Sequence, residues 1–207
     1  MKPQFRGYIP QVAFFIALCG CVFLIVQSKN LNILILNAIY SLTLVGMYGV
    51  CALYHRPIWS RRKYLIIKRL DHAAIFALIA GTATPICLLV FKNGTGLRLL
   101  FLIWGIAIFG MVLTLFWAQS PKWVRASLYI ILGWLIVPYF SEIKFQLGTP
   151  EFQLLLAGGI FYTLGALVYA FKRPNPFPQS FGYHEIFHVF VVIASTLHFI
   201  VIYKLTT

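Results

Sequence analysis

Residues 8–26 read YIPQVAFFIALCGCVFLIV, a run of nineteen positions without a charged side chain. The hydrocarbon core of a membrane is about 30 Å thick, and a helix needs roughly 20 apolar residues to cross it. Lys2 and Arg6 precede the run, as they would in a secretory signal, but the run is long enough to span and lacks an Ala-x-Ala cleavage site. We therefore expect it to be a retained first membrane span.

Six further apolar runs follow, bounded by charged residues or by turns rich in Gly, Pro and Asn. They cover residues 31–55, 73–91, 97–117, 124–141, 151–171 and 184–203. Of all 207 residues, 61% are hydrophobic and 10% are charged, whereas a soluble domain has roughly 25% charged residues. The sequence predicts an all-α integral membrane protein whose single domain, residues 1–207, contains seven transmembrane helices.

Basic residues are distributed unevenly between the two sides of the membrane. The side of the N-terminus carries twelve of them: Lys2, Arg6, Arg56, Arg61, Arg62, Lys63, Lys68, Arg69, Lys122, Arg125, Lys172 and Arg173. The opposite side carries five: Lys29, Lys92, Arg98, Lys144 and Lys204. Because cytoplasmic loops are enriched in Lys and Arg, we expect a cytoplasmic N-terminus and, after seven spans, a C-terminus outside.

Ionisable residues within membrane spans are costly, so those that are present usually have a partner or a function. The chain has nine His, Asp and Glu residues: His55, Asp71, His72, Glu142, Glu151, His184, Glu185, His188 and His198. His55 ends the second predicted span and Asp71 opens the third, while His184 and His188 lie in the first turns of the seventh. These four residues should share one depth at the cytoplasmic ends of their helices, which indicates a single site.

His184 and His188 are four residues apart and therefore share one face of a helix. At this spacing the Cβ atoms are about 6 Å apart, and two imidazoles can bind one metal ion. His55 would add a third nitrogen and leave the fourth position open, as in catalytic zinc sites, with Asp71 available to hold a bound water. The alternative is that these side chains are interfacial residues hydrogen-bonded to loops and headgroups.

Three ordered motifs at these positions resemble the hemolysin III branch of the progestin and adiponectin receptor family. They are CALYH (51–55), LDHAAIFALIAGTATP (70–85) and GYHEIFH (182–188), and the similarity extends from the second span to the end of the chain. The resemblance implies a seven-helix fold and a zinc ion held by His55, His184 and His188. It also implies that Asp71 acts on the zinc-bound water. Relatives are grouped with alkaline ceramidases as membrane metal-dependent hydrolases, and adiponectin receptors are associated with ceramide hydrolysis.

One position departs from the family pattern. The family's Ser-x-x-x-His motif is Cys51-x-x-x-His55 in this chain. Cys51 lies one turn before His55 on the same face, so we expect it to support the site with weaker hydrogen bonding than a serine would provide.

The other ionisable residues near the site are not expected to bind the ion. His72 and Glu185 point away from the helix faces that carry the predicted ligands, and a loop or headgroup partner is expected for His72. His198 should lie about 15 Å deeper than the site as a satisfied core histidine.

The predicted site supports two hypotheses for function. The first is a membrane-embedded zinc hydrolase of a lipid amide or ester, ceramidase-like by resemblance, with zinc-bound water as nucleophile and Asp71 as its proton acceptor. The second is a non-enzymatic sensor or homeostasis protein, or a membrane-lytic protein of the hemolysin type, with a zinc site. The expected cofactor is one zinc ion per chain, and the expected partners are membrane lipids, including a ceramide-like substrate.

The net charge of +13 is explained by membrane topology, so no nucleic acid partner is expected. Anionic headgroups of the inner leaflet are the expected counterpart, in the plasma (inner) membrane of a bacterium. Residues 56–69, RPIWSRRKYLIIKR, alternate basic and apolar clusters. This segment could be a short helix on the leaflet surface or a connection whose charges only set the topology.

Overall fold

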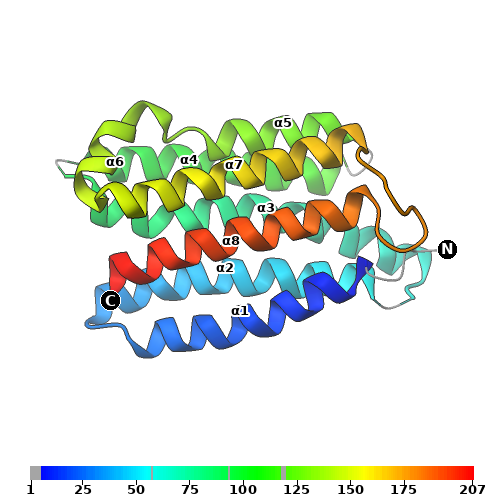
Figure 1. The fold of residues 1–207 in the computed structure, drawn as a ribbon, viewed down its shortest axis with the longest axis horizontal. Helices are drawn as coiled ribbons and strands as arrows, with labels where there is room; N and C mark the ends of the chain where they lie inside the picture. Colours follow the sequence, from blue (N-terminus) through cyan, green and yellow to red (C-terminus); the bar gives the residue numbers. More distant parts are fainter. Residues whose placement is uncertain (1–5, 57, 93, 118–119) are drawn as a thin grey trace.

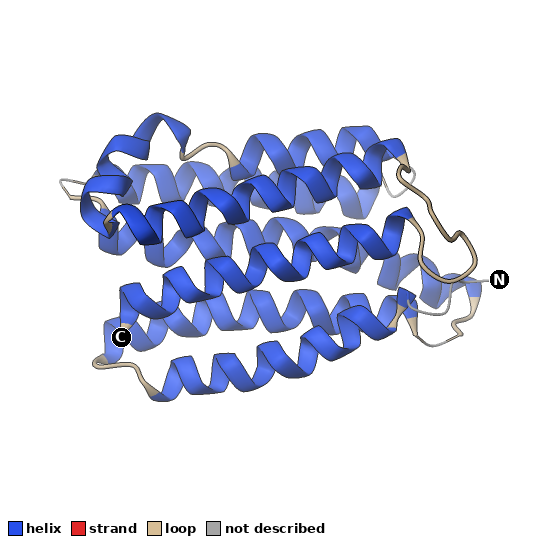
Figure 2. Ribbon diagram, in the orientation of Figure 1, coloured by secondary structure: helices blue, strands red, loops and turns tan. Residues whose placement is uncertain are grey.

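The computed structural model describes residues 6–56, 58–92, 94–117 and 120–207. All named elements in these ranges are helices (Figure 2). In chain order they are α1 (Tyr8–Val26), α2 (Leu31–His55), α3 (Arg61–Val90), α4 (Thr95–Phe116), α5 (Lys122–Gly133), the 3₁₀ helix η2 (Val137–Tyr139), α6 (Phe140–Leu147), α7 (Thr149–Phe171) and α8 (Tyr183–Thr206). Lys2 and Pro57, which belong to the charge count and the basic segment above, lie outside the described residues.

Seven segments of the described chain are long and apolar enough to cross a membrane. Six are single helices, and the seventh, Lys122–Leu147, comprises α5, η2 and α6. The chain is therefore an all-α, multi-pass integral membrane protein, which confirms the predicted fold class. The first two spans also have the predicted bounds. The start of α2 is well defined because Asn30 accepts a hydrogen bond from the backbone N–H of Ile33 (3.0 Å), a standard N-cap.

The helices form one elongated bundle in which consecutive spans mostly pack side by side (Figure 1). α8 departs from this order, because it packs against α1 and α3 as well as against α7. The start of α1 and the end of α8 lie at opposite ends of the bundle, as an odd number of crossings requires (Figure 1). We call the end where α2 finishes and α8 begins the site end, and the opposite one the far end.

α3 is the central helix of the bundle. The buried share of its most apolar window is 61%, against 17% for the span Lys122–Leu147. α4 approaches it closely, because Gly110 lies directly against the ring of Phe76 and leaves no room for a Cβ. The ring of Phe76 is 1% exposed. A helix enclosed in this way can present its polar residues to the interior of the bundle, where lipid cannot reach them.

The basic segment between the second and third spans does not form a separate surface helix. Residues from Arg61 onward belong to α3, which runs without interruption for 30 residues to Val90. The physical reason is that the sequence from 61 to 80 contains no Gly or Pro, so nothing ends the helix at the membrane boundary. As a consequence, Asp71 lies inside α3 and not at its start. The alternative, that the charges of the segment only set the topology, stays a prediction.

The fifth span was predicted as one run over 124–141 but is broken. α5 ends at Gly133, and the chain passes through η2 before α6 begins at Phe140. Pro138 lies in η2, and its ring is incompatible with an uninterrupted helix interior. Gly133 and the adjacent Trp134 line a cavity of the bundle, whereas Val137 and Pro138 in η2 are exposed.

Candidate metal centre

Three histidine rings meet at the site end, carried by two helices that are far apart in the sequence. His55 is the last residue of α2, and His184 and His188 lie in the first turns of α8. The ring centroids of these pairs are separated by 4.9 Å (55 and 184), 5.2 Å (55 and 188) and 4.7 Å (184 and 188). The Nε2 atoms of His55 and His184 lie 3.2 Å apart. The structure thus brings together the three side chains predicted as ligands, and their binding of zinc stays a prediction.

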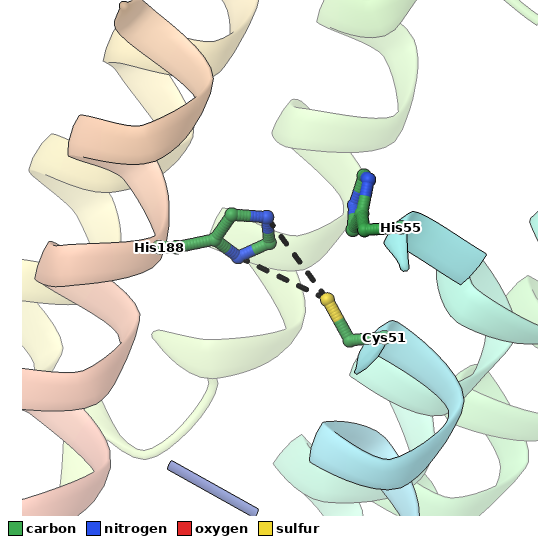
Figure 3. Close-up of side chains that lie close together, drawn as sticks. All are labelled: Cys51, His55 and His188. Atoms are coloured by element: carbon green, nitrogen blue, oxygen red, sulfur yellow. Dashed lines mark hydrogen bonds between the residues drawn. The ribbon is translucent and has the colours of Figure 1, made fainter. Parts of the chain in front are cut away.

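Cys51 forms a compact group of potential ligand atoms with His55 and His188 (Figure 3). Its Sγ lies 3.9 Å from Nδ1 and 4.0 Å from Nε2 of His188. One ligand atom from each of the three residues lies within 4.8 Å of the other two. The three residues are buried, with exposed fractions of 4%, 7% and 5%. This buried Cys/His/His group could hold a metal ion.

The donor set fits the geometry of a small tetrahedral ion. Two nitrogens held about 2.05 Å from such an ion lie about 3.3 Å apart, and a nitrogen and a thiolate sulfur lie about 3.6 Å apart. The observed separations are 3.2 Å between the nitrogens of His55 and His184, and 3.9 Å between Cys51 Sγ and His188 Nδ1. Soft sulfur with imidazole nitrogen is a donor set that suits zinc. Cys51, His55 and His188 therefore form a donor set that suits such an ion, whereas His184 lies outside this group and approaches it through His55.

Asp71 approaches this group from α3. Asp71, Cys51, His184 and His188 all line one internal cavity. The carboxylate that was predicted to act on a bound water therefore lies at the wall of the space that a substrate would have to enter.

The cavity has a volume of about 150 Å³ and runs from the histidines into the bundle. Its walls are largely apolar and include Met47, Leu78, Ile79, Ile103, Leu132 and Val191. His198 lies at the deep end, ten residues or about 15 Å along α8 from His188. Its Nε2 is hydrogen-bonded to the carbonyl oxygen of Leu155 (3.0 Å), but its buried Nδ1 has no hydrogen-bond partner among the described residues, so the ring is only half satisfied. The site end therefore opens into a long apolar interior.

His72 has a different partner from the one expected. It is 7% exposed and lines the cavity, and its Nε2 lies 3.4 Å from the hydroxyl of Tyr169 on α7. The same hydroxyl accepts a hydrogen bond from the Arg125 guanidinium (3.4 Å). The Tyr169 ring also contacts His184, with centroids 5.8 Å apart. His72 therefore belongs to an internal polar network beside the histidines. The reason is that α7 packs over His72, where a loop or a lipid headgroup was expected.

Glu185 has a role that the sequence analysis missed. Its side chain is fully buried, with one carboxylate oxygen 2.8 Å from the Arg6 Nε and the other accepting a hydrogen bond from the Gly182 backbone N–H (2.8 Å). Two residues after Arg6, the ring of Tyr8 lies 4.2 Å from the guanidinium carbon of Arg56, next to His55. The start of α1 therefore contacts both helices that carry the histidines. A glutamate three residues after a helix start is a capping signal, but nothing local indicates its partner 179 positions away.

Comparison with known proteins places this chain among a group of membrane proteins. Residues 1–199 match the family described as haemolysin-III related. The chain is 35% identical to Hemolysin-3 of Bacillus cereus over 163 residues, covering 78% of this chain and 70% of that protein. It is 29% identical to the Hemolysin-3 homolog of Bacillus subtilis (strain 168) over 191 residues, covering 91% and 86%. Heptahelical transmembrane protein ADIPOR3 of Oryza sativa subsp. japonica is 28% identical over 222 aligned positions, covering 96% of this chain and 48% of that protein.

Proposed function

The chain belongs to the haemolysin-III related family, the hemolysin III branch of the progestin and adiponectin receptors, and on this premise we propose that it is a zinc-dependent membrane hydrolase. The proposed substrate is an amide or ester of a lipid. The observation that carries the proposal is the convergence of three histidine rings, two of which, His184 and His188, line a largely apolar cavity together with Asp71.

In this proposal His55, His184 and His188 hold one zinc ion per chain. Zinc held by neutral imidazoles supplies a Lewis acid that polarises a carbonyl and lowers the pKa of water to about 7. Asp71 is the proton acceptor, because its carboxylate lies on the cavity wall beside Cys51. The Cys51 thiol lines the same cavity as that carboxylate, next to His188.

The shape of the cavity supports a lipid substrate. A ceramide-like molecule would place its carbonyl group near the histidines and its acyl chain along the apolar walls toward His198. Burial of an acyl chain in such a space contributes about 0.8 kcal/mol for each methylene removed from water. The same walls exclude bulk water from the reacting carbonyl. Membrane lipids are thus the proposed partners, and the acyl chain of the lipid would contribute most of the binding.

The proposed orientation puts the site end at the cytoplasmic surface. Twelve basic residues on that side against five on the other support a cytoplasmic N-terminus and a C-terminus outside. Anionic headgroups of the inner leaflet would then surround the basic first turns of α3. The two Bacillus relatives support the plasma membrane of a bacterium as the location.

A second candidate function is a non-enzymatic sensor, homeostasis or membrane-lytic protein. The observation that favours it is the sulfur of Cys51 beside His188, because a fourth protein ligand is typical of structural zinc sites. A lytic role would correspond to the name Hemolysin-3, which belongs to the relatives. Turnover of a lipid by the purified protein separates the two candidates.

The test compares the purified wild type with Asp71→Asn and with Glu142→Gln, a matched carboxylate-to-amide control in α6. Each protein is incubated with ceramide-like amides and simple lipid esters, and released fatty acid is measured beside zinc content. We expect Asp71→Asn to keep its zinc and lose activity by about a hundredfold or more, since the general base is removed. The control should match the wild type. If neither the zinc-loaded wild type nor zinc-loaded Cys51→Ser hydrolyses any of these lipids, the hydrolase is contradicted and the sensor is favoured.

A further inference from the structure

Cys51 stands where the family pattern has a serine, and its sulfur lies among the potential ligand atoms. The Sγ atom is 3.9 Å from Nδ1 of His188 and belongs to the group in which every ligand atom lies within 4.8 Å of the others. Asp71 of α3 lines the same cavity as the thiol. The side chain of Cys51 is buried, with 4% of its surface exposed. The sulfur is therefore a buried potential ligand atom that faces His188.

Both printed donor separations require only a small contraction, or none, to surround one ion. The distance of 3.9 Å between Cys51 Sγ and His188 Nδ1 compares with about 3.6 Å expected for a tetrahedral site. The distance of 3.2 Å between the Nε2 atoms of His55 and His184 compares with about 3.3 Å. Each of these two pairs thus needs a shift of only a few tenths of an ångström, and the ligand atoms of Cys51, His55 and His188 lie within 4.8 Å of one another. A serine hydroxyl at position 51 would be a much weaker donor for zinc than a thiolate.

We propose that Cys51 is a fourth ligand of the metal ion, so that Cys51, His55, His184 and His188 form a closed site. This inference rests on the proposed zinc centre and deepens it. When Cys51 binds, its S–H bond breaks, the sulfur keeps the electron pair and donates it to the ion, and the proton passes to the Asp71 carboxylate, which lines the same cavity. The exchange needs no oxidant or reductant. When the sulfur leaves the ion, the same proton returns to it.

A closed site has two consequences for this chain. Hydrolysis requires Cys51 to leave the ion before a carbonyl can reach it, so Cys51 restrains the reaction that a serine would permit. The sulfur also raises the preference of the site for softer ions over an all-imidazole site. Asp71 serves both states, as the proton acceptor for the thiol and then for water.

The test uses the full-length protein, stripped of metal and reconstituted with Co²⁺ or Zn²⁺. The variants are Cys51→Ser and the control Cys87→Ser. Cys87 is also buried but lies on α3, whereas Cys51 lies on α2. Wild type and Cys87→Ser should show a sulfur-to-cobalt charge-transfer band, and X-ray absorption should give a zinc–sulfur distance of about 2.3 Å. Cys51→Ser should lose both signals and bind the ion more weakly by at least about tenfold, since even the loss of residues behind the ligands costs 10–100-fold.

The outcomes separate this inference from the proposed function. Fully metal-loaded wild type with only nitrogen and oxygen neighbours around the ion would overturn the role of Cys51 and leave the three-histidine centre standing. Wild type that binds no metal would overturn both. The absorption spectra of the wild type decide the question alone if Cys51→Ser does not fold. A higher hydrolytic activity in Cys51→Ser than in the wild type would support the proposal that Cys51, when bound to the ion, slows hydrolysis.

Discussion

The two ends of α8 carry the same kinds of polar residue in different surroundings. At the site end, Glu185 pairs with Arg6 at 2.8 Å, and the glutamate side chain is 0% exposed. At the far end, Lys204 pairs with Glu151 at 2.7 Å, but these side chains are 48% and 21% exposed. Nearly equal distances therefore join one pair whose carboxylate is sheltered from water and one pair that water reaches.

The histidines of α8 repeat this contrast. His188 faces the sulfur of Cys51 and the rings of two other histidines. His198 faces the backbone carbonyl of Leu155, which can only accept a hydrogen bond. A ring nitrogen that donates a hydrogen bond to a carbonyl has a structural role and cannot bind a metal ion at the same time. Residue type and spacing alone do not distinguish these two histidines, whereas the atoms they face do.

The largest difference that we expect concerns topology: the two ends of α8 should lie on opposite sides of the membrane. A reporter that works only outside the cytoplasm should be active when fused after Thr207, because twelve basic residues lie on the side of the N-terminus. The same reporter fused before residue 1 should be inactive. Activity of a cytoplasm-only reporter after Thr207 would reverse the assignment of the site end to the cytoplasm.

The next largest effect concerns metal content. His188→Ala should lose most of about one zinc per chain, because the remaining donors cannot complete a stable site. His198→Gln should keep its zinc, since glutamine can still donate a hydrogen bond to the Leu155 carbonyl. Elemental analysis of the two purified variants measures this difference. Equal zinc content would refute the assignment of ligands to the site end.

A smaller effect is expected from the buried ion pair. Glu185→Gln keeps an oxygen for the Gly182 N–H but removes the charge facing Arg6, and should lower the free energy of unfolding by about 3 kcal/mol. Reversible unfolding of the metal-free protein in detergent measures it. Arg6→Gln alone and the double variant complete a cycle. Strictly additive effects would show that the pair does not couple the start of α1 to α8.

The smallest effect is expected at the far end. Glu151→Gln should not change stability measurably, because exposed ion pairs are screened and both side chains can turn to water. The same unfolding measurement serves as its test. A loss as large as that of Glu185→Gln would mean that burial does not explain the contrast between the ends of α8.

Several features could be predicted from the sequence because they depend on neighbouring residues only. The apolar runs 8–26 and 31–55 coincide with α1 and α2, since hydrophobic length is a sum over consecutive side chains. The shared depth of His55, His184 and His188 also followed from counting residues along each span. The start of α3 did not, because the basic residues after Arg61 form helix as readily as apolar ones do and carry no stop signal.

By itself, then, the sequence determined seven membrane spans, the level of the histidines and their grouping as one candidate site. Only the tertiary structure decided which atoms meet there. Cys51 and His188 are 137 positions apart, and Arg6 and Glu185 are 179 apart. Such contacts depend on how α8 packs between α1, α3 and α7 and on how each helix is rotated about its axis. Depth is set by the membrane one helix at a time, whereas the partner of a buried polar group is set by all the helices around it.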